Sequence, residues 1–337
     1  MTKRVFWMVM GLLLLFSMQA MAGGGSSSAG TGGRTGTLRL GIGTSTLGSN
    51  YYVVGTTIAQ MLTKYMTGVE VTAEVTNGSG VNYGLVQNKE VELALIINNA
   101  AYNAWRGEGF GVERGRVQQD VRALCALMPS SLNVYALSSS PINTIEDLNG
   151  RSISPGAAGS GGDLVLQDIV PLLGLRPSRI QHMGMSDINN NIIDRMLDAC
   201  ALFAGYPSAT VLEIEASADL KFVTIPAETR KKIIENFPYY FEGTEPPGTY
   251  KNTPATGYTT IMTPNLFIAH KDVPDDVAYE IIKLMFEHMD ELVAGSGSFR
   301  YVIKDSVLSA SIPLHPGAVK YFREQGYTIP NNLLPPR

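Results

Sequence analysis

Glycine- and serine-rich segments hold most of the residues of this chain that could do chemistry. Their sequences begin the motifs of nucleotide-binding enzymes but do not complete them. Gly156 and Gly161 have the spacing of a phosphate-binding loop, but Gly162 and Asp163 stand where that loop requires Lys and then Ser or Thr. A dinucleotide-binding pattern also begins in the chain, but Thr46 occupies the position of its third glycine. The sequence therefore offers no nucleotide-phosphate site of either kind.

Hydrolytic and metal chemistry have as little support. Ser160 lacks the Gly-x-Ser-x-Gly frame of a hydrolase nucleophile, because Ala158 occupies the first glycine position. The four histidines are scattered without the spacing of metal ligands: His182, His270, His288 and His315. We assign no catalytic residue, no metal and no cofactor, although a Ser-His-Asp site assembled from distant residues stays open.

The same small residues suit the binding of an anion. Four loops rich in Gly, Ser, Thr and Asn each follow a predicted strand and precede a predicted helix, at residues 43–50, 77–80, 156–162 and 205–208. The N-terminus of a helix has free N–H groups and a partial positive charge, so several that converge can hold an anion without Lys or Arg. One such loop alone is an ordinary strand-to-helix connection, and the prediction depends on several occurring in one chain.

Twelve residues of these loops and of the neighbouring helices are expected to line the ligand cleft: Ser49, Asn50, Tyr51, Tyr52, Ser79, Asn82, Asn98, Asn99, Ser160, Gly161, Gly162 and Tyr206. Ser160 and Gly161 would supply hydroxyl and backbone N–H donors to the anion. The chain is expected to form two lobes, and Ser79 would supply such donors from the other lobe. The Asn side chains would bind polar groups of the ligand. Either Tyr51 or Tyr52 would touch the ligand, and the other would belong to the core, since adjacent helical residues point in different directions.

Strand and helix patterns alternate along the chain and would position these loops. Strands are predicted at 38–42, 69–75, 93–97, 151–154, 180–183 and 199–204, and apolar residues at helical spacing follow each of them. Pro171 is expected to kink one of these helices or end it early, and Gly174 to stop it. The alternation predicts an α/β protein with parallel sheets, helices on both faces, and a ligand at the carboxyl ends of the strands.

The length of 337 residues suits two lobes better than one core. Predicted strands at 132–138 and 261–269 would cross between the lobes and carry a hinge. Lobe 1 would comprise residues 37–137 together with 259–330, completed by helices around 277–292 and 318–325, and lobe 2 would comprise residues 138–258. The Pro- and Gly-rich stretch from 237 to 250 is expected to be a structured loop near the rim of the cleft.

The first residues have the layout of a secretory signal peptide. Lys3 and Arg4 precede an apolar run at 5–18, and small residues precede a cleavage site after Ala22. The run is shorter than the ~20 residues that a spanning helix needs, so cleavage is expected and not membrane anchoring. Residues 23–36 are predicted to be a flexible leader to an exported protein.

Charge and cysteine content narrow the class of protein further. A formal net charge of −4 gives no basic field for nucleic acid. Cys125 and Cys200 lie in apolar runs that look like buried strands. An exported compartment would permit a disulfide, but the predicted lobes separate these strands, so two buried free thiols are expected.

An ordered set of short motifs resembles the TAXI-type solute receptors, which are the binding components of one branch of the tripartite ATP-independent periplasmic (TRAP) transporters. The matching residues are Ser49, Tyr51, Tyr52 and Gly55; Gly78, Ser79 and Asn82; Glu146 to Arg151; Gly159-Ser160-Gly161; Gly205-Tyr206-Pro207-Ser208; Phe237-Pro238-Tyr239-Tyr240; and Gly248-Thr249-Tyr250. The matches keep the family's order across nearly the whole mature chain. The sequence departs from the family at Val81, where many relatives carry Glu, at Gly162, which replaces a frequent Thr, and at Asn99, where an Asp is often found.

The resemblance implies a two-lobed periplasmic-binding-protein fold of type II, the Venus flytrap, with a hinge between α/β lobes. It implies capture of a small organic anion, such as a dicarboxylate or an acidic amino acid, and docking onto the integral membrane subunits of a TRAP transporter. A monomeric, periplasmic solute-binding protein is therefore the first hypothesis. A ligand-sensing periplasmic subunit that signals to a membrane receptor is the alternative, and a secreted hydrolase comes third.

Overall fold

The computed structural model describes residues 37–111, 115–302 and 306–336. The predicted signal peptide at 1–22 and leader at 23–36 lie outside the described residues. Within the described part, strands and helices alternate as the periodicity predicts.

The strands are β1 (Leu38–Gly43), β2 (Val69–Glu74), β3 (Leu93–Ile97), β4 (Val121–Leu137), β5 (Ser152–Gly156), β6 (Arg179–His182), β7 (Ala199–Gly205), β8 (Leu220–Phe222), β9 (Phe241–Glu245) and β10 (Tyr258–His270). The α-helices are α1 (Asn50–Tyr65), α2 (Ser79–Gln87), α3 (Asn98–Trp105), α4 (Gly161–Leu173), α5 (Met185–Ile193), α6 (Ala209–Ser217), α7 (Ala227–Asn236), α8 (Asp275–Glu287), α9 (Met289–Gly295) and α10 (Pro316–Glu324). Short 3-10 helices lie at Ile145–Leu148, Gly297–Tyr301 and Asn331–Leu333.

The strands form one sheet in the order β2-β1-β3-β10-β4-β7-β5-β6, with β8 added beside β4 and β9 beside β10. Strands β1, β2 and β3 are parallel, and so are β5, β6 and β7, whereas β4 and β10 run antiparallel to their neighbours. Read from either edge, the order is second, first, third and then a crossing strand. The chain therefore repeats one α/β arrangement twice.

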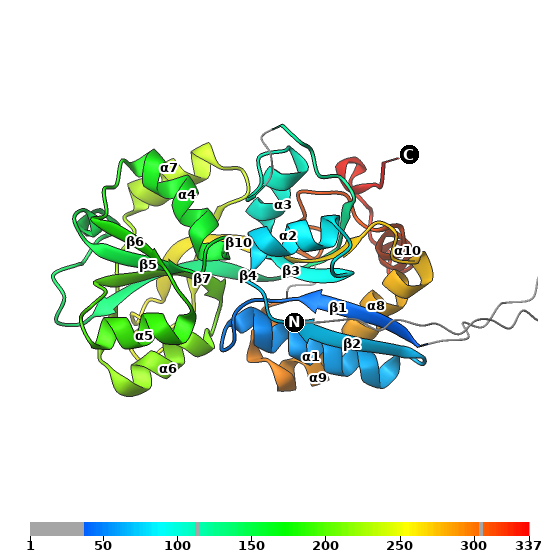
Figure 1. Cartoon of the computed structure of the whole chain (residues 1–337), viewed down its shortest axis with the longest axis horizontal. Coiled ribbons are helices and arrows are strands. Elements are labelled where there is room, and N and C mark those ends of the chain that lie inside the picture. Colours follow the sequence, from blue (N-terminus) through cyan, green and yellow to red (C-terminus); the bar gives the residue numbers. More distant parts are fainter. Residues whose placement is uncertain (1–36, 112–114, 303–305, 337) are drawn as a thin grey trace, which may run out of the picture. The chain divides into compact units, whose positions relative to one another are not determined.

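Two lobes are built on these halves of the sheet (Figure 1). Strands β1, β2 and β3 pack with α1, α8 and α10 in the first lobe, whose core includes Ile42, Ile58 and Phe267. Strands β5 and β7 pack in the second lobe, with one core toward α4 and α7 and another toward α5 and α6. Helices thus cover both faces of the second lobe's sheet, and the predicted two-lobed α/β fold is confirmed.

Strands β4 and β10 connect the lobes. Residues 121–131 of β4 pair with β10, while residues 130–135 pair with β7 of the second lobe. Pro129 lies opposite Pro264 in the paired strands. Proline has no backbone N–H, so this point of the crossing lacks two donors that a regular ladder would have. The backbone hydrogen bonding between the two connecting strands is therefore reduced here, close to the segments where the hinge is predicted.

Three local predictions need correction. Pro171 does not end α4 early: the helix continues to Leu173, because the proline lies in its last turn, and Gly174 caps it with φ of 67°. The helix predicted around 277–292 is two helices, α8 and α9, separated at His288. The stretch at 237–250 is not only a loop, since residues 241–245 form β9 and pair with β10.

Candidate functional site

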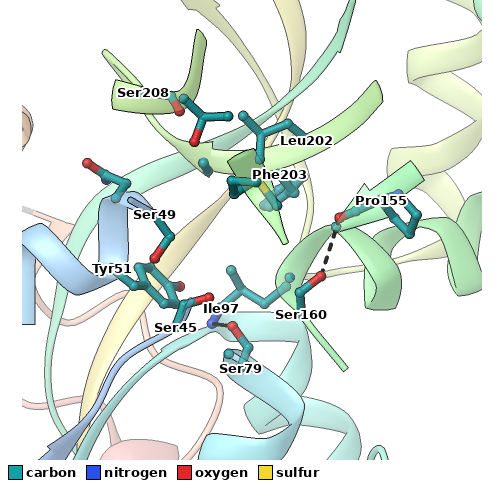
Figure 2. Close-up of a pocket in the computed structure, with 17 residues that line it drawn as sticks. Ser45, Ser49, Tyr51, Ser79, Ile97, Pro155, Ser160, Leu202, Phe203 and Ser208 are labelled. Carbon is teal, nitrogen blue, oxygen red and sulfur yellow. Dashed lines mark hydrogen bonds between the residues drawn. The ribbon is translucent and has the colours of Figure 1, made fainter. Parts of the chain in front are cut away.

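A cavity lies between the lobes, at the carboxyl ends of β3, β5 and β7 (Figure 2). It holds about 480 Å³ of space not filled by atoms, part of it continuous with solvent. The first lobe contributes Ser45, Ser49, Asn50, Tyr51, Gly78, Ser79 and Ile97. The second lobe contributes Pro155, Ser160, Gly161, Gly162, Met185, Leu202, Phe203, Ala204, Ser208 and Thr210.

Five helices begin at this cavity. Ser49 caps α1, Gly78 and Ser79 lie at the start of α2, Ser160 caps α4, Met185 opens α5 and Ser208 precedes α6. The first N–H groups of each helix have no partner within that helix. The convergence of helix N-termini that the loop pattern predicts is therefore present.

The first lobe presents a polar wall built by the start of α1. The Ser49 hydroxyl accepts a hydrogen bond from the Tyr52 N–H at 3.3 Å, which fixes the first turn of the helix. The Tyr51 hydroxyl donates to Asn265 Oδ1 at 2.5 Å, and burial raises the pKa of Tyr51 well above its usual value. Figure 2 shows Ser49 and Tyr51 on one side of the cavity and Ser160 on the other. Tyr51, and not Tyr52, thus lines the cavity.

The second lobe presents the start of α4. The Ser160 hydroxyl accepts from the Asp163 N–H and donates to the Pro155 carbonyl, both at 3.3 Å. Its proton is therefore already in use, so this loop offers a ligand mainly the backbone N–H groups of Gly161 and Gly162. A Cβ on Gly162 would lie 2.1 Å from the Pro155 carbonyl oxygen, so only glycine lets α4 approach β5 this closely.

Several contacts join the lobes beside the cavity. The Gly80 N–H of the first lobe donates to the Gly159 carbonyl of the second at 2.9 Å. The Asn50 side chain reaches toward Gly205, where a Cβ would lie 2.6 Å from its Nδ2. The lobes therefore meet around the cavity in this structure.

Two polar atoms on the cavity wall are buried without a hydrogen-bond partner. Asn50 is 6 % exposed, and its Oδ1 accepts from the Ser298 hydroxyl at 3.1 Å, but its Nδ2 has no acceptor. Ser208 is 1 % exposed, and its hydroxyl has no partner either. Leaving such a group unpaired costs about 1–3 kcal/mol. A polar ligand in the cavity would remove that cost.

The cavity wall carries no charge among the described residues that line it. Asp163 directly follows the lining residue Gly162 but does not line the cavity. Its carboxylate accepts from the Gly159 N–H at 2.8 Å and contacts His182 Nε2 at 2.7 Å. The field in the cavity therefore comes from helix N-termini, each of which favours an anion by about 0.3–1 kcal/mol at exposed sites and more when buried.

Seven of the twelve predicted residues meet at the cavity: Ser49, Asn50, Tyr51, Ser79, Ser160, Gly161 and Gly162. Asn82 does not line it. Its Nδ2 donates to the backbone carbonyls of Gly43, Thr44 and Leu95, and its Oδ1 accepts from Thr76 at 2.6 Å. The side chain ties α2 to β1 and β3 instead.

Asn98 and Asn99 also serve the fold at the start of α3. Asn98 Oδ1 accepts from the Ser311 N–H at 2.9 Å. Asn99 Nδ2 donates to the Tyr240 hydroxyl at 3.1 Å and to Asp168 at 3.4 Å. Asn99 therefore links the two lobes but does not line the cavity.

Tyr52 and Tyr206 lie outside the cavity wall as well. The Tyr52 side chain is half-buried on α1 and is absent from the lining residues. Tyr206 follows β7 and packs its ring against Tyr301, with centroids 4.6 Å apart. Burial raises the pKa of Tyr206 to about 12. It supports the wall near Ser208 instead of forming it.

Ten further lining residues are not among the twelve predicted to line the cleft: Ser45, Gly78, Ile97, Pro155, Met185, Leu202, Phe203, Ala204, Ser208 and Thr210. Ser45, Gly78 and Ser208 lie in loops that the pattern identified, so position in the loop could have revealed them. The apolar members carry no such signal, because a Leu or Phe in a strand looks the same whether it faces core or cavity.

The described residues contain neither a histidine bonded to Ser160 nor a cluster of metal ligands. No histidine of the described part bonds to the Ser160 hydroxyl, which donates to a backbone carbonyl. No three His, Cys, Asp or Glu side chains come together there as metal ligands.

Cys125 and Cys200 are buried and unpaired, as predicted. No helix of the described residues has the length and apolar character needed to cross a membrane.

Comparison with known proteins relates the chain to one family and to several solved folds. Residues 42–326 match the NMT1-like family. Similar solved structures include a putative L-cystine ABC transporter protein from Listeria monocytogenes, with 13% identity, a TM-score of 0.49 and coverage of 80% of this chain and 98% of that one. The periplasmic aliphatic sulphonate binding protein SsuA from Escherichia coli has 13% identity, a TM-score of 0.42 and coverage of 85% and 83%. A TctC solute binding protein from Polaromonas has 14% identity, a TM-score of 0.43 and coverage of 79% and 87%. At this degree of similarity the solved structures carry no information about the ligand of this chain.

Proposed function

Because this chain belongs to the NMT1-like family, we propose that it is a solute-binding protein that captures a small organic anion between its two lobes. The protein would be exported to the periplasm after cleavage behind Ala22 and would act as a monomer. It would deliver the anion to the integral membrane subunits of a TRAP transporter of the TAXI branch, as the ordered sequence motifs indicate.

One observation carries the proposal: buried polar atoms without partners lie on a cavity where five helices begin. Asn50 Nδ2 is a buried donor without a partner among the described residues, and an acceptor on a ligand in the cavity would satisfy it. The backbone N–H groups of Gly161 and Gly162, at the start of α4 in the second lobe, also have no acceptor within their helix. A wall with donors in excess and no negative charge suits an anion.

The arrangement also explains how binding and closure are coupled. The donors come from both lobes, so a bound anion contributes to holding the lobes together. Separation at the crossing strands would expose the cavity, and closure would bury the ligand. The closed form would then present one joined surface to the membrane subunits.

A binding screen with one isosteric variant tests the proposal. The chain from Gly23 onward is titrated with carboxylates, amino acids and sugars while its thermal midpoint is measured. A ligand at ~100 times its dissociation constant adds about 2.7 kcal/mol to the free energy of unfolding. In a protein of this size we expect a shift of at least several degrees with an anion.

Asn50→Asp sharpens the test, because it keeps the acceptor for Ser298 and replaces the donor Nδ2 by a carboxylate oxygen. We expect at least a 100-fold loss of anion affinity. Asn332→Asp makes the same change at an exposed position and should leave affinity unchanged. Stabilisation by neutral sugars only, or full anion affinity in Asn50→Asp with its fold intact by circular dichroism, would contradict the proposal.

A further inference from the structure

The two lobes contribute different chemistry to the cavity wall. From the first lobe, Ile97 is the single apolar side chain among the described lining residues, and the others are Ser, Asn, Tyr or Gly. From the second lobe, five lining residues are apolar, Pro155, Met185, Leu202, Phe203 and Ala204, and they lie beside the polar starts of α4 and α6. A ligand that fits this wall has a polar part toward the helix starts and an apolar part toward the apolar side chains of the second lobe.

The described lining residues carry no charge, so none of their side chains can form an ion pair with a second charged group on a ligand. Helix N-termini and unpaired donors can stabilise one anionic head. A second carboxylate on the ligand would lie against the apolar wall without a Lys or Arg. An ammonium group would have no carboxylate to pair with, since Asp163 is held by Gly159 and His182. Burying an unpaired charge in this way costs several kcal/mol.

The closeness of the lobes limits ligand length. The Gly80 N–H to Gly159 carbonyl bond of 2.9 Å brings the two lobes into direct contact at the edge of the cavity. Gly78 of the first lobe is equally close to the second, since its Cβ would lie 3.4 Å from Ser160 Cα. A chain of many carbons would hold these contacts apart.

We propose that the cavity takes a monocarboxylate with a short aliphatic chain, its head toward the starts of α1, α2, α4 and α6 and its chain against the apolar side chains of β5 and β7. The inference rests on the proposed function and narrows it. It differs from the dicarboxylates and acidic amino acids that the motif resemblance implies.

Four compounds with the same five-carbon chain separate the alternatives: pentanoate, glutarate, 5-aminopentanoate and pentanamide. Their dissociation constants are measured by calorimetry on the chain from Gly23, refolded from denaturant to remove any bound solute. We expect pentanoate to bind at least tenfold more tightly than each of the other three.

A charge placed in the apolar wall should reverse this preference. Met185 opens α5 on the cavity wall, and lysine has a similar length and flexibility. In Met185→Lys we expect the ratio of glutarate to pentanoate affinity to rise at least tenfold. Met196→Lys adds the same charge at an exposed position outside the lining residues and should leave the ratio unchanged.

The outcomes distinguish the two proposals. Equal binding of pentanamide and pentanoate would contradict anion recognition, and with it the proposed function. Tighter binding of glutarate or 5-aminopentanoate by the unmodified protein would overturn only the monocarboxylate inference. Failure of all four compounds to bind would overturn that inference too, as would an unchanged affinity ratio in a folded Met185→Lys protein.

Discussion

Two buried polar regions of this protein differ in what they lack. On the cavity wall, the unpartnered atoms include a donor, Asn50 Nδ2, and a hydroxyl, that of Ser208. In a second cluster, the crossing-strand cluster, Ser131 and Asn133 of β4 meet Glu245 of β9, and the unpartnered atoms are both acceptors, Glu245 Oε2 and Asn133 Oδ1. The cavity therefore needs an acceptor from a ligand, whereas this crossing-strand cluster needs a proton.

The geometry of the crossing-strand cluster supports this difference. Glu245 Oε1 accepts from the Ser131 hydroxyl and from Asn133 Nδ2, the latter at 2.8 Å, while all three residues are fully buried. Burial raises the pKa of Glu245, and the hydrogen bonds from Ser131 and Asn133 lower it. Burial has the larger effect, so the pKa is raised to about 6. A protonated carboxyl has a hydroxyl to donate, and an ionised one leaves Oε2 buried without a donor. Buried polar atoms without partners can thus indicate a ligand in one place and a titrating group in another.

The largest effect is expected from Asn133→Ala. The substitution removes the Nδ2 group that donates to Glu245 and to Ser131, so a buried carboxylate loses one of its two donors. We expect the free energy of unfolding to fall by about 3 kcal/mol at pH 8, and by less at pH 5, where Glu245 is neutral. Denaturant unfolding at the two pH values measures both. An equal loss at both would show that the ionised form of Glu245 is not what Asn133 stabilises.

The next effect concerns pH. The folded pKa of Glu245 is raised, so its contribution to stability is fully present below the unfolded pKa and is lost as pH rises through about 6. The rise in the pKa of Glu245 from its usual 4.5 to about 6 corresponds to about 2 kcal/mol. Three tyrosine hydroxyls interact with this charge, those of Tyr206, Tyr250 and Tyr258, and they stay neutral in that range because burial raises their pKa values further above the usual value.

Glu245→Gln isolates this contribution. Glutamine keeps an acceptor for Asn133 and adds a donor in place of Oε2. The stability of the variant relative to the unmodified protein should therefore grow by about 2 kcal/mol between pH 4.5 and pH 7.5. Thermal or denaturant unfolding across this range measures the difference, and a difference independent of pH would contradict it.

How much of this could be read from the sequence depends on the kind of signal. Ser49, Ser79 and Ser160 were found because strand-to-helix loops of parallel sheets meet at one edge, wherever the lobes lie. Asn82 and Asn98 look identical in sequence to ligand-binding Asn residues, yet their amides bond to the backbone of neighbouring segments. Short polar side chains near helix starts satisfy either need, and only three-dimensional contacts decide which.

Glu245 shows the opposite limit of sequence reasoning. It lies in a Pro- and Gly-rich stretch without strand periodicity, and β9 exists because it pairs with the edge of β10. A charged residue in such a stretch looks exposed. Its burial depends on Ser131 and Asn133, which are more than 100 positions away in the chain.

A smaller effect is expected from Ser208→Ala. Removing a buried hydroxyl without a partner costs the empty protein no hydrogen bond, so the free energy of unfolding should change by less than about 0.5 kcal/mol or rise slightly. The affinity for the bound anion should fall about tenfold, the equivalent of about 1.4 kcal/mol. Calorimetry and denaturant unfolding of the same preparation test both statements. A marked loss of stability without loss of affinity would show that the hydroxyl serves the fold.

The smallest effect separates two adjacent tyrosines. Tyr52→Phe should change affinity by less than twofold, because Tyr52 is not among the lining residues. Tyr51→Phe removes the hydroxyl that donates to Asn265 at 2.5 Å and should weaken binding several-fold through loss of the ordered wall. Equal effects of the two substitutions would contradict the assignment of Tyr51 to the cavity.

The most direct test of the central claim is a crystal structure of the protein with the monocarboxylate that gives the largest thermal shift. We expect the carboxylate between the lobes, with a ligand oxygen within about 3.2 Å of Asn50 Nδ2 or the Ser208 hydroxyl. The aliphatic chain should lie against Leu202 and Met185. A ligand bound elsewhere, such as over α8 and α10, with both polar groups still unpaired, would contradict the account.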